Sequence, residues 1–303
     1  MRKSKELYPE EKWLARNIIG ETYELYKLHD VVIEVKSRIS NNIYELLKNS
    51  NQYEPPFNPD KLFPERKILD KKEDVMDSKQ SGLLIPVKGG FKMKINSTHS
   101  YNRKRFTTAH EIGHTYFYDL TAETPCKRYQ RTSSTYMIEE DYASSFAAEI
   151  LMPKPFLSKI IQERNLQPSF RTLKILQRMF VVSFESICKQ TIRNHRLLDC
   201  LIFESTLSET GRITNLSQTI CKGDSFKNWT VPKTFESIDL NDKKSDVFKV
   251  TLYELLSKLF NKLIAKPSSI EKSICYKENV YSIKSQIIND YTKNRCITII
   301  KKI

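Results

Sequence analysis

Apolar residues recur at spacings of three and four over residues 11–49, which is the pattern of one helix face. The repeating positions are Leu25, Leu28, Val32, Val35, Ile39 and Leu46, with Asn42 interrupting the series. The pattern suits either a dimerising coiled coil or one or two amphipathic helices packed on the body. We favour packed helices, because a coiled coil needs about three to four clean heptads. Gly20 and His29-Asp30 are the expected breaks.

The next stretch, "YEPPFNPDKLFPERK", holds four prolines that end any helix and mark a domain boundary near residue 55. It is followed by "SGLLIPVKGGFKMKINSTHS", in which two short apolar runs flank Lys88-Gly89-Gly90. Glycines between two such runs are typical of a β-hairpin. Strands are therefore expected on both sides of this turn.

Helices are predicted over residues 103–120, with Thr107 or Thr108 near the start, and over 138–153, where prolines follow. Residues 171–180 and 184–195 indicate two more, joined by a short turn. After Leu197 the pattern changes to strands at 197–206, 211–223, 279–288 and 296–302, with a helix at 245–264. This mixture predicts an α+β protein with an N-terminal helical segment (1–54), a central domain (55–200) and a mixed C-terminal domain (201–303).

The net charge of +14 is spread along the chain, with no long basic run. It is compatible with weak nucleic-acid binding or an acidic partner, but a generally Lys-rich composition explains it equally well. No apolar run approaches the roughly 18 residues of a membrane span, and no secretory signal is visible. The six cysteines form no Cys-x-x-Cys pair, as in a reduced protein. We therefore expect a cytoplasmic protein without a membrane partner.

The stretch "AHEIGH" (109–114) carries the clearest chemistry. On a helix, four residues advance about 400°, so His110 and His114 share one face and can bind one metal ion. Zinc accepts neutral imidazoles, and it lowers the pKa of a bound water toward about 7. Glu111 points about 100° away from His110. It is therefore expected to act as general base rather than as a ligand.

A catalytic zinc site needs a third protein ligand, and "IEEDYASSFAAEILMP" offers one. Ala143 and Ala147 form a small face on which two helices can meet, and Glu140 shares that face. Glu140 is the predicted third ligand and Glu139, one position around, is the alternative. Either acid is also compatible with a solvated helix N-terminus. Gly113 leaves room for a close approach to the motif helix.

These segments resemble the ImmA/IrrE metallopeptidases over about residues 55–200. The resemblance rests on "INSTHSYNRKRFTTAHEIGH" and "EEDYASSFAAEILMP", in particular on Arg105-Phe106-Thr107, Phe146-Ala147-Ala148 and Leu151-Met152-Pro153. It implies a compact zincin-like domain with a small β-hairpin sheet, in which His110, His114 and Glu140 hold zinc and Glu111 is the base. The implied substrates are DNA-binding repressors or antitoxins. The family often has Asn where this chain has Ser144, and relatives suggest a sensory role for residues 201–303 by analogy.

Other parts of the reaction remain open. Residues 91–97 are expected to offer a strand edge to an extended peptide. A donor to the oxyanion is needed, and five side chains are chemically able: His99, Tyr101, Arg103, Tyr118 and Tyr136. A His₂Glu site also accepts Mn, Fe or Co. The oligomeric state is not predicted.

Two other functions compete with peptidase activity. The basic helix–turn–helix pattern over residues 171–196 could bind DNA, although its turn lacks glycine. A zinc-fold module that only binds partners is the third interpretation, and the intact His110, Glu111, His114 and Glu140 argue against it. Metal content and chelator-sensitive cleavage of a repressor encoded beside the gene would separate these functions.

Overall fold

The computed structural model describes residues 6–129, 133–207, 213–227, 269–276, 279–290 and 293–303. It divides into two compact units, residues 1–160 with 177–183 and residues 161–176 with 184–303. The N-terminal helical segment therefore belongs to the first unit, while the three-part division at residues 54 and 200 stays a prediction. The helix expected over 245–264 lies outside the described residues. None of the described helices is long and apolar enough to cross a membrane.

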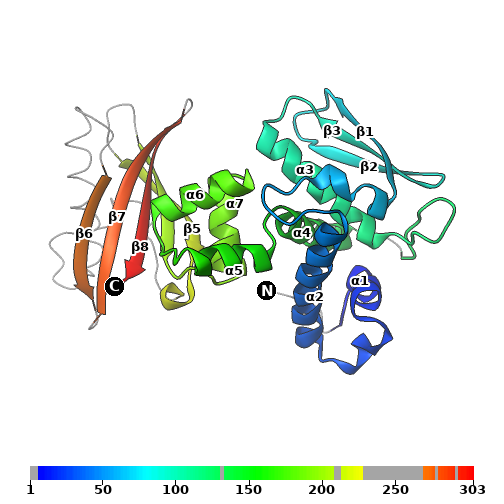
Figure 1. Cartoon of the computed structure of the whole chain (residues 1–303), viewed down its shortest axis with the longest axis horizontal. Coiled ribbons are helices and arrows are strands. Elements are labelled where there is room, and N and C mark those ends of the chain that lie inside the picture. Colours follow the sequence, from blue (N-terminus) through cyan, green and yellow to red (C-terminus); the bar gives the residue numbers. More distant parts are fainter. Residues whose placement is uncertain (1–5, 130–132, 208–212, 228–268, 277–278, 291–292) are drawn as a thin grey trace. The chain divides into compact units, whose positions relative to one another are not determined.

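The first unit contains a three-stranded sheet of β1 (Ile68–Asp74), β2 (Gly82–Val87) and β3 (Gly90–Asn96), in the order β1-β3-β2 (Figure 1). The predicted hairpin is confirmed, since β2 and β3 pair antiparallel around a two-residue turn. β3 alternates buried and exposed positions, and it pairs parallel with β1, which the sequence pattern did not predict. Because β3 is the central strand, the expectation that residues 91–97 offer a free edge is wrong. The edge strand on this side is β2.

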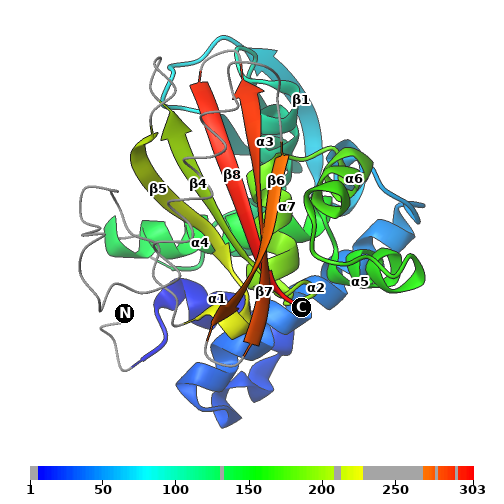
Figure 2. The same cartoon turned by 90° about the vertical axis from the view of Figure 1, so that its left-hand side faces the viewer.

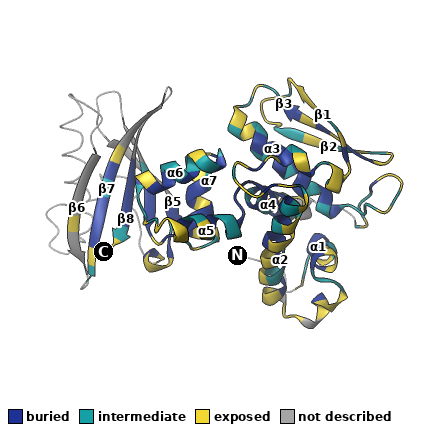
Figure 3. Cartoon of the chain, viewed as in Figure 1, coloured by how far each residue is buried: buried dark blue, intermediate teal, exposed yellow. Residues whose placement is uncertain are grey.

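The N-terminal segment forms α1 (Pro9–Ile19), a short 3₁₀ helix η1 (Glu21–Leu25) and α2 (Leu28–Asn49). Gly20 breaks the helix as predicted, with a φ of 95°. The second predicted break, at His29-Asp30, lies slightly too late, because the chain leaves η1 after Leu25 and α2 already begins at Leu28. One face of α2 is buried, and it packs on α1 and on α4 (Ser133–Leu151) (Figure 3). Its members are Val31, Val35, Ile39, Ile43 and Leu47.

This packing agrees with the favoured interpretation of residues 11–49, but the buried stripe differs from the predicted one. Among the predicted positions whose side chains are described, Val35 and Ile39 are buried, Val32 and Leu46 are only partly buried, and Asn42 is exposed. The predicted series used a spacing close to 3.5 residues, which suits a supercoil. A straight helix turns every 3.6 residues, and its buried face drifts away from such a series.

The helices that follow the sheet along the chain are α3 (Tyr101–His114), the 3₁₀ turn η4 (Thr115–Phe117), α4, α5 (Lys154–Glu163) and α6 (Phe170–Phe180). Two short 3₁₀ helices, η2 (Pro59–Leu62) and η3 (Pro64–Arg66), lie in the proline-rich stretch. α3 contacts β2, β3 and α4. It begins earlier than predicted, so Thr107 and Thr108 lie inside the helix, and it ends earlier, at His114. The hydroxyls of Thr107 and Thr108 donate to the carbonyl oxygens four residues earlier in α3, at 2.9 and 3.0 Å.

Arg105 has a structural role in the first unit. Its buried guanidinium donates to the carbonyl oxygens of Phe57 at 2.6 Å and Phe180 at 3.0 Å, and also to that of Val181. Burial lowers the pKa of Arg105, and the three carbonyl oxygens replace lost hydration. The side chain ties the chain before the sheet to the turn after α6. Within the Arg105-Phe106-Thr107 signature, Arg105 therefore serves to hold the fold together.

The second unit is built on a five-stranded sheet in the order β5-β4-β8-β7-β6, with every neighbouring pair antiparallel (Figure 2). Its strands are β4 (Leu201–Leu207), β5 (Ile213–Lys222), β6 (Ser269–Tyr276), β7 (Asn279–Asp290) and β8 (Lys293–Lys302). β6 was not predicted, whereas strands were expected at the other four positions. A 3₁₀ turn η6 (Asp224–Phe226) follows β5. Helices and strands in both units confirm the α+β class.

The pair considered for DNA binding is formed by α6 and by α7 (Phe184–Cys188), which continues into a π-helical turn η5 (Lys189–Asn194). The α-helical part of the second helix is only five residues long. Ile187, Cys188 and Ile192 are buried on it. The exposed Lys189 is paired with Glu185 at 2.6 Å. None of these contacts favours DNA binding, which stays a prediction.

Candidate metal centre

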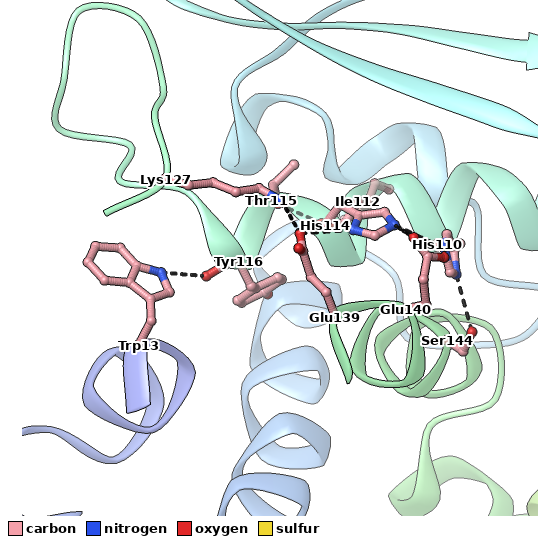
Figure 4. Close-up of polar contacts among 10 residues, drawn as sticks. All are labelled: Trp13, His110, Ile112, His114, Thr115, Tyr116, Lys127, Glu139, Glu140 and Ser144. Atoms are coloured by element: carbon pink, nitrogen blue, oxygen red, sulfur yellow. Dashed lines mark hydrogen bonds and ion pairs between the residues drawn. The ribbon is translucent and has the colours of Figure 1, made fainter. Parts of the chain in front are cut away.

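His110 and His114 lie one turn apart on α3, and both face Glu140 on α4 (Figure 4). The Nε2 atoms of the two histidines are 3.1 Å apart. Glu140 places Oε2 3.0 Å from Nε2 of His110 and Oε1 3.4 Å from Nε2 of His114. One donor atom from each of the three residues lies within 4.8 Å of the others. The sequence-predicted histidines and the acid are thus brought together in space.

This donor set fits a tetrahedral divalent ion. Two ligand atoms at about 2.0 to 2.1 Å from a tetrahedral zinc ion lie roughly 3.3 Å from each other. The Nε2–Nε2 separation is 3.1 Å, and each Nε2 lies 3.0 or 3.4 Å from its nearer Glu140 oxygen, Oε2 for His110 and Oε1 for His114, which is close to that value. Two imidazoles and one carboxylate leave a fourth position open, as catalytic zinc sites require.

Each histidine has a second partner at its other ring nitrogen. Ser144 Oγ lies 3.3 Å from Nδ1 of His110, and Glu139 Oε1 lies 3.5 Å from Nδ1 of His114. Hydrogen bonds from Nδ1–H leave each Nε2 as the free lone pair directed at a metal. Ser144 thus occupies the position of the family's Asn and still contacts the ring. Glu139 lies beside His114 as an orienting group, on the opposite side of the ring from Nε2.

Glu139 is completely buried, and Lys127 from the segment before α4 makes an ion pair with it (Figure 4). Burial alone raises the pKa of Glu139, but the hydrogen bonds from His114 and Lys127 outweigh it, and the net pKa is lowered. The carboxylate is therefore ionised at neutral pH. The chain Lys127–Glu139–His114 fixes the orientation of one metal-facing imidazole.

The electrostatics of the cluster favour a cation between its members. Burial by itself lowers the pKa of His114, but hydrogen bonds with Glu139 and Glu140 raise it to about 9. Burial raises the pKa of Glu140, and hydrogen bonds with His110 and His114 lower it overall. A positive charge is thus stabilised at the point where the two Nε2 atoms and the Glu140 carboxylate meet. A divalent ion supplies that charge without a proton on His114.

Glu111 is buried beside this cluster but is not part of it. Burial raises the pKa of Glu111, and the neighbouring His114 and His110 partly offset that effect. A Cβ atom on Gly82 of β2 would lie only 2.6 Å from Glu111 Oε1. The absence of a side chain at Gly82 therefore lets the edge strand run directly past this carboxylate.

A cavity of about 550 Å³ opens onto both groups. Its wall includes the start of β2, the metal-facing residues and Glu111. Of the five oxyanion candidates, Arg103, Tyr118 and Tyr136 line it, whereas His99 and Tyr101 are not among its lining residues. The structure thus reduces the candidates for oxyanion stabilisation from five to three.

Gly113 explains how α3 and α4 come close enough to share the cluster. A Cβ at this position would lie 2.8 Å from the carbonyl oxygen of Ala143 and 3.0 Å from Cβ of Phe146. Real Cβ atoms do not make such short contacts, so the two helices need glycine here. The small face predicted around Ala143 meets the motif helix at this glycine.

Gly113→Ala is therefore expected to push the helices apart and destabilise the protein by about 1 to 3 kcal/mol, the usual effect of overpacking a core. It should also weaken zinc binding, because Glu140 moves with α4. Urea denaturation and a zinc titration measure the two effects. Unchanged stability and zinc affinity in Gly113→Ala would show that the close approach is not required.

Several contributors to the site were not predicted from the sequence. They are Gly82, Asn96, Lys127 and the orienting role of Glu139. Asn96 is fully buried at the end of β3, and its Nδ2 donates to the carbonyls of Met76, Asp77 and Gln80 at 2.9 to 3.3 Å. It thereby shapes the loop that leads into β2. The one sequence signal for this role of Asn96 was the presence of an asparagine at the end of a predicted strand.

Comparison with known proteins adds a family to this geometry. Residues 67–191 match the family described as Peptidase_M78, IrrE N-terminal-like domain. No curated protein matches the chain. A solved Mycobacterium tuberculosis transcriptional regulator is distantly similar, at 10% identity and a TM-score of 0.47, over 88% of each chain. The matched residues contain His110, Glu111, His114 and Glu140, and the match confirms the ImmA/IrrE resemblance.

Proposed function

We propose that this protein is a zinc-dependent endopeptidase in which His110, His114 and Glu140 hold the metal and Glu111 is the general base. The observation that supports this most strongly is the convergence of both Nε2 atoms and the Glu140 carboxylate within 4.8 Å. Glu111 opens onto the same cavity, in a domain of a peptidase family. A binding-only module would not need this buried carboxylate beside the cluster.

When bound, the metal lowers the pKa of a water molecule toward about 7 and polarises the scissile carbonyl. The Glu111 carboxylate takes the proton of the attacking water and passes it to the leaving amide nitrogen. Arg103, Tyr118 and Tyr136 line the cavity and are the proposed candidates for donating to the developing oxyanion.

The substrate is proposed to bind along β2 as an added strand. The Asn96 N–H donates to Ser81 O at 2.9 Å, so the residue just before β2 bonds toward β3. Bonded and non-bonded positions alternate in an antiparallel pair. Gly82 and Leu84 therefore direct their main-chain groups to the open edge, as does Pro86, which has no N–H to lose. An extended peptide bonded to Gly82 and Leu84 would pass Glu111.

The substrate class proposed here, a helix-turn-helix repressor or antitoxin, rests on the family resemblance. It also fits the open cavity, which admits a peptide segment rather than only a small molecule. Cleavage of such a protein would relieve the repression that it exerts. Zinc is the proposed metal, and Mn²⁺ or another divalent ion can occupy the same donors.

The test uses a small helix-turn-helix protein encoded beside the gene, incubated with zinc-loaded enzyme and analysed by mass spectrometry. We expect two complementary fragments from a single cleavage site, and none with the Glu111→Gln variant. An intact protein after prolonged incubation, in conditions where an unstructured peptide is hydrolysed, would exclude this substrate class while leaving peptidase activity in place. Fragments produced equally by both enzymes would point to a contaminating protease.

A further inference from the structure

A second cavity, of about 490 Å³, lies in the first unit. It is lined by residues of α1 and α2, by Arg66 at the end of η3, and by the segment that follows α3. Tyr118 is the one residue that lines both this cavity and the metal cavity. The volume of this second cavity falls within the roughly 300 to 1,000 Å³ that is usual for small-molecule sites. Nothing in the proposed peptidase reaction uses it.

The Arg66 guanidinium is held in place at the wall of this cavity. Its Nε donates to Thr115 Oγ1 at 2.9 Å, and Thr115 is fully buried. The guanidinium carbon lies 3.7 Å from the centre of the Tyr116 ring. Tyr116 in turn stacks on Phe146, with 4.0 Å between ring centres. An arginine fixed on both sides in this way is pre-organised for a planar, bidentate partner.

No such partner is supplied by the part of the chain that the structure describes. Among those residues, Arg66 makes the bond to Thr115 and the ring contact, and Glu65 attracts it electrostatically, but no carboxylate lies within ion-pair distance of it. Burial lowers the pKa of Arg66, which means that its charge is poorly solvated. Arg66 is half-buried, and a cation that is partly removed from water is stabilised by a counter-ion. The two Nη groups of Arg66 therefore form a built but unused anion site.

The charges around the cavity select the kind of anion. Arg66 is the one cationic side chain lining it, while Glu45 and Asp119 also belong to the wall. Asp119 is paired with Arg128 at 2.7 Å and Glu45 with Lys48 at 3.2 Å, so neither neutralises Arg66. Arg66 therefore supplies the single unpaired positive charge among the residues that line this cavity. A single negative charge matches the site.

We propose that this cavity binds a small organic monocarboxylate, whose carboxylate pairs with the Nη groups of Arg66. The side-chain amides of Asn17, Asn42 and Asn49 line the same cavity and can bond to polar groups of the ligand body. Trp13, also in the wall, donates from Nε1 to the carbonyl of Tyr116 at 3.3 Å (Figure 4). The site thus joins the N-terminal helices to the end of α3. It does not depend on the proposed peptidase function.

Trp13 provides a reporter for the test. The other tryptophan, Trp229, lies outside the described residues and is replaced by phenylalanine in all proteins used. Zinc-loaded protein is titrated with acetate, benzoate and the neutral isosteres acetamide and benzamide, with Trp13 fluorescence and calorimetry as readouts. We expect saturable binding of at least one carboxylate, at least tenfold tighter than its amide. Arg66→Met should remove that preference, whereas Arg38→Met, at an exposed arginine of α2 paired with Glu34, should retain it.

Equal binding of a carboxylate and its amide, or no saturable binding of either carboxylate, would overturn the proposal. So would an unchanged preference in Arg66→Met. If that variant does not fold, as judged by circular dichroism, Arg66→Lys replaces it, because lysine keeps the charge and lacks the fork. It should weaken carboxylate binding several-fold, and full affinity would count against the bidentate pair. Inorganic phosphate is the remaining probe, and binding tighter than that of both carboxylates would refute the monoanion class.

Discussion

Replacing Glu111 by glutamine is expected to lower kcat for peptide hydrolysis by roughly 100- to 10,000-fold, the usual contribution of a general base. Glutamine has the shape of glutamate but cannot accept a proton from water. The variant should keep its metal, because Glu111 is not one of the three converging donors. It should also fold normally, since the uncharged amide is easier to bury than a carboxylate whose pKa is already raised by burial.

Rate, metal content and thermal stability of Glu111→Gln are measured side by side with wild type. Glu34→Gln, at a position on α2 outside the metal cavity, is the matched control and should behave as wild type in all three assays. Hydrolysis by Glu111→Gln at the wild-type rate would show that another group takes the proton. Loss of metal in this variant would instead show that Glu111 is a ligand.

Replacing Glu140 by alanine should weaken zinc binding far more than the same change at Glu139. Glu140 directs its carboxylate at both Nε2 atoms, so its loss removes one of three protein ligands. Glu139 contacts Nδ1 of His114 and only orients the ring. Loss of an orienting partner typically reduces metal affinity about 10- to 100-fold. Glu140→Ala is expected to exceed that range clearly.

A titration of both variants against a competing zinc chelator separates the two roles. Glu139→Gln gives a further comparison, because its amide oxygen can still accept the Nδ1–H bond. It should therefore bind zinc more tightly than Glu139→Ala. If Glu139→Ala loses zinc while Glu140→Ala retains it, the ligand assignment shifts by one residue along α4. All variants need the wild-type circular dichroism spectrum, since Glu139 is fully buried.

The features predicted well from the sequence depend on neighbours within a few residues. The His-Glu-x-x-His spacing fixes one helix face, and the turn at Lys88-Gly89 fixes the hairpin. The small face around Ala143 directed attention to Glu140, which the structure places beside the histidines. Such patterns are local, and a helix or a hairpin expresses them directly.

The features that were missed depend on contacts between distant segments. β1 and β3 are neighbours in the sheet and pair parallel, although β2 lies between them in the sequence. No local pattern could therefore show that β3 is the central strand and β2 an edge strand. Lys127 reaches Glu139 from a separate loop, and this contact distinguishes an orienting acid from a ligand. Gly82 and Gly113 are needed because another backbone or side chain approaches each of them. Sequence alone shows a glycine and not what it faces.

The central claim is that a metal held by His110, His114 and Glu140 supports peptide hydrolysis. Its most direct test is the hydrolysis rate of an unstructured, fluorogenic peptide mixture by metal-stripped protein during stepwise addition of zinc. The account predicts no hydrolysis without metal and a linear rise that stops at about one equivalent, the capacity of a single His₂Glu site. Hydrolysis that persists in metal-free protein, or none at full zinc occupancy, would contradict it.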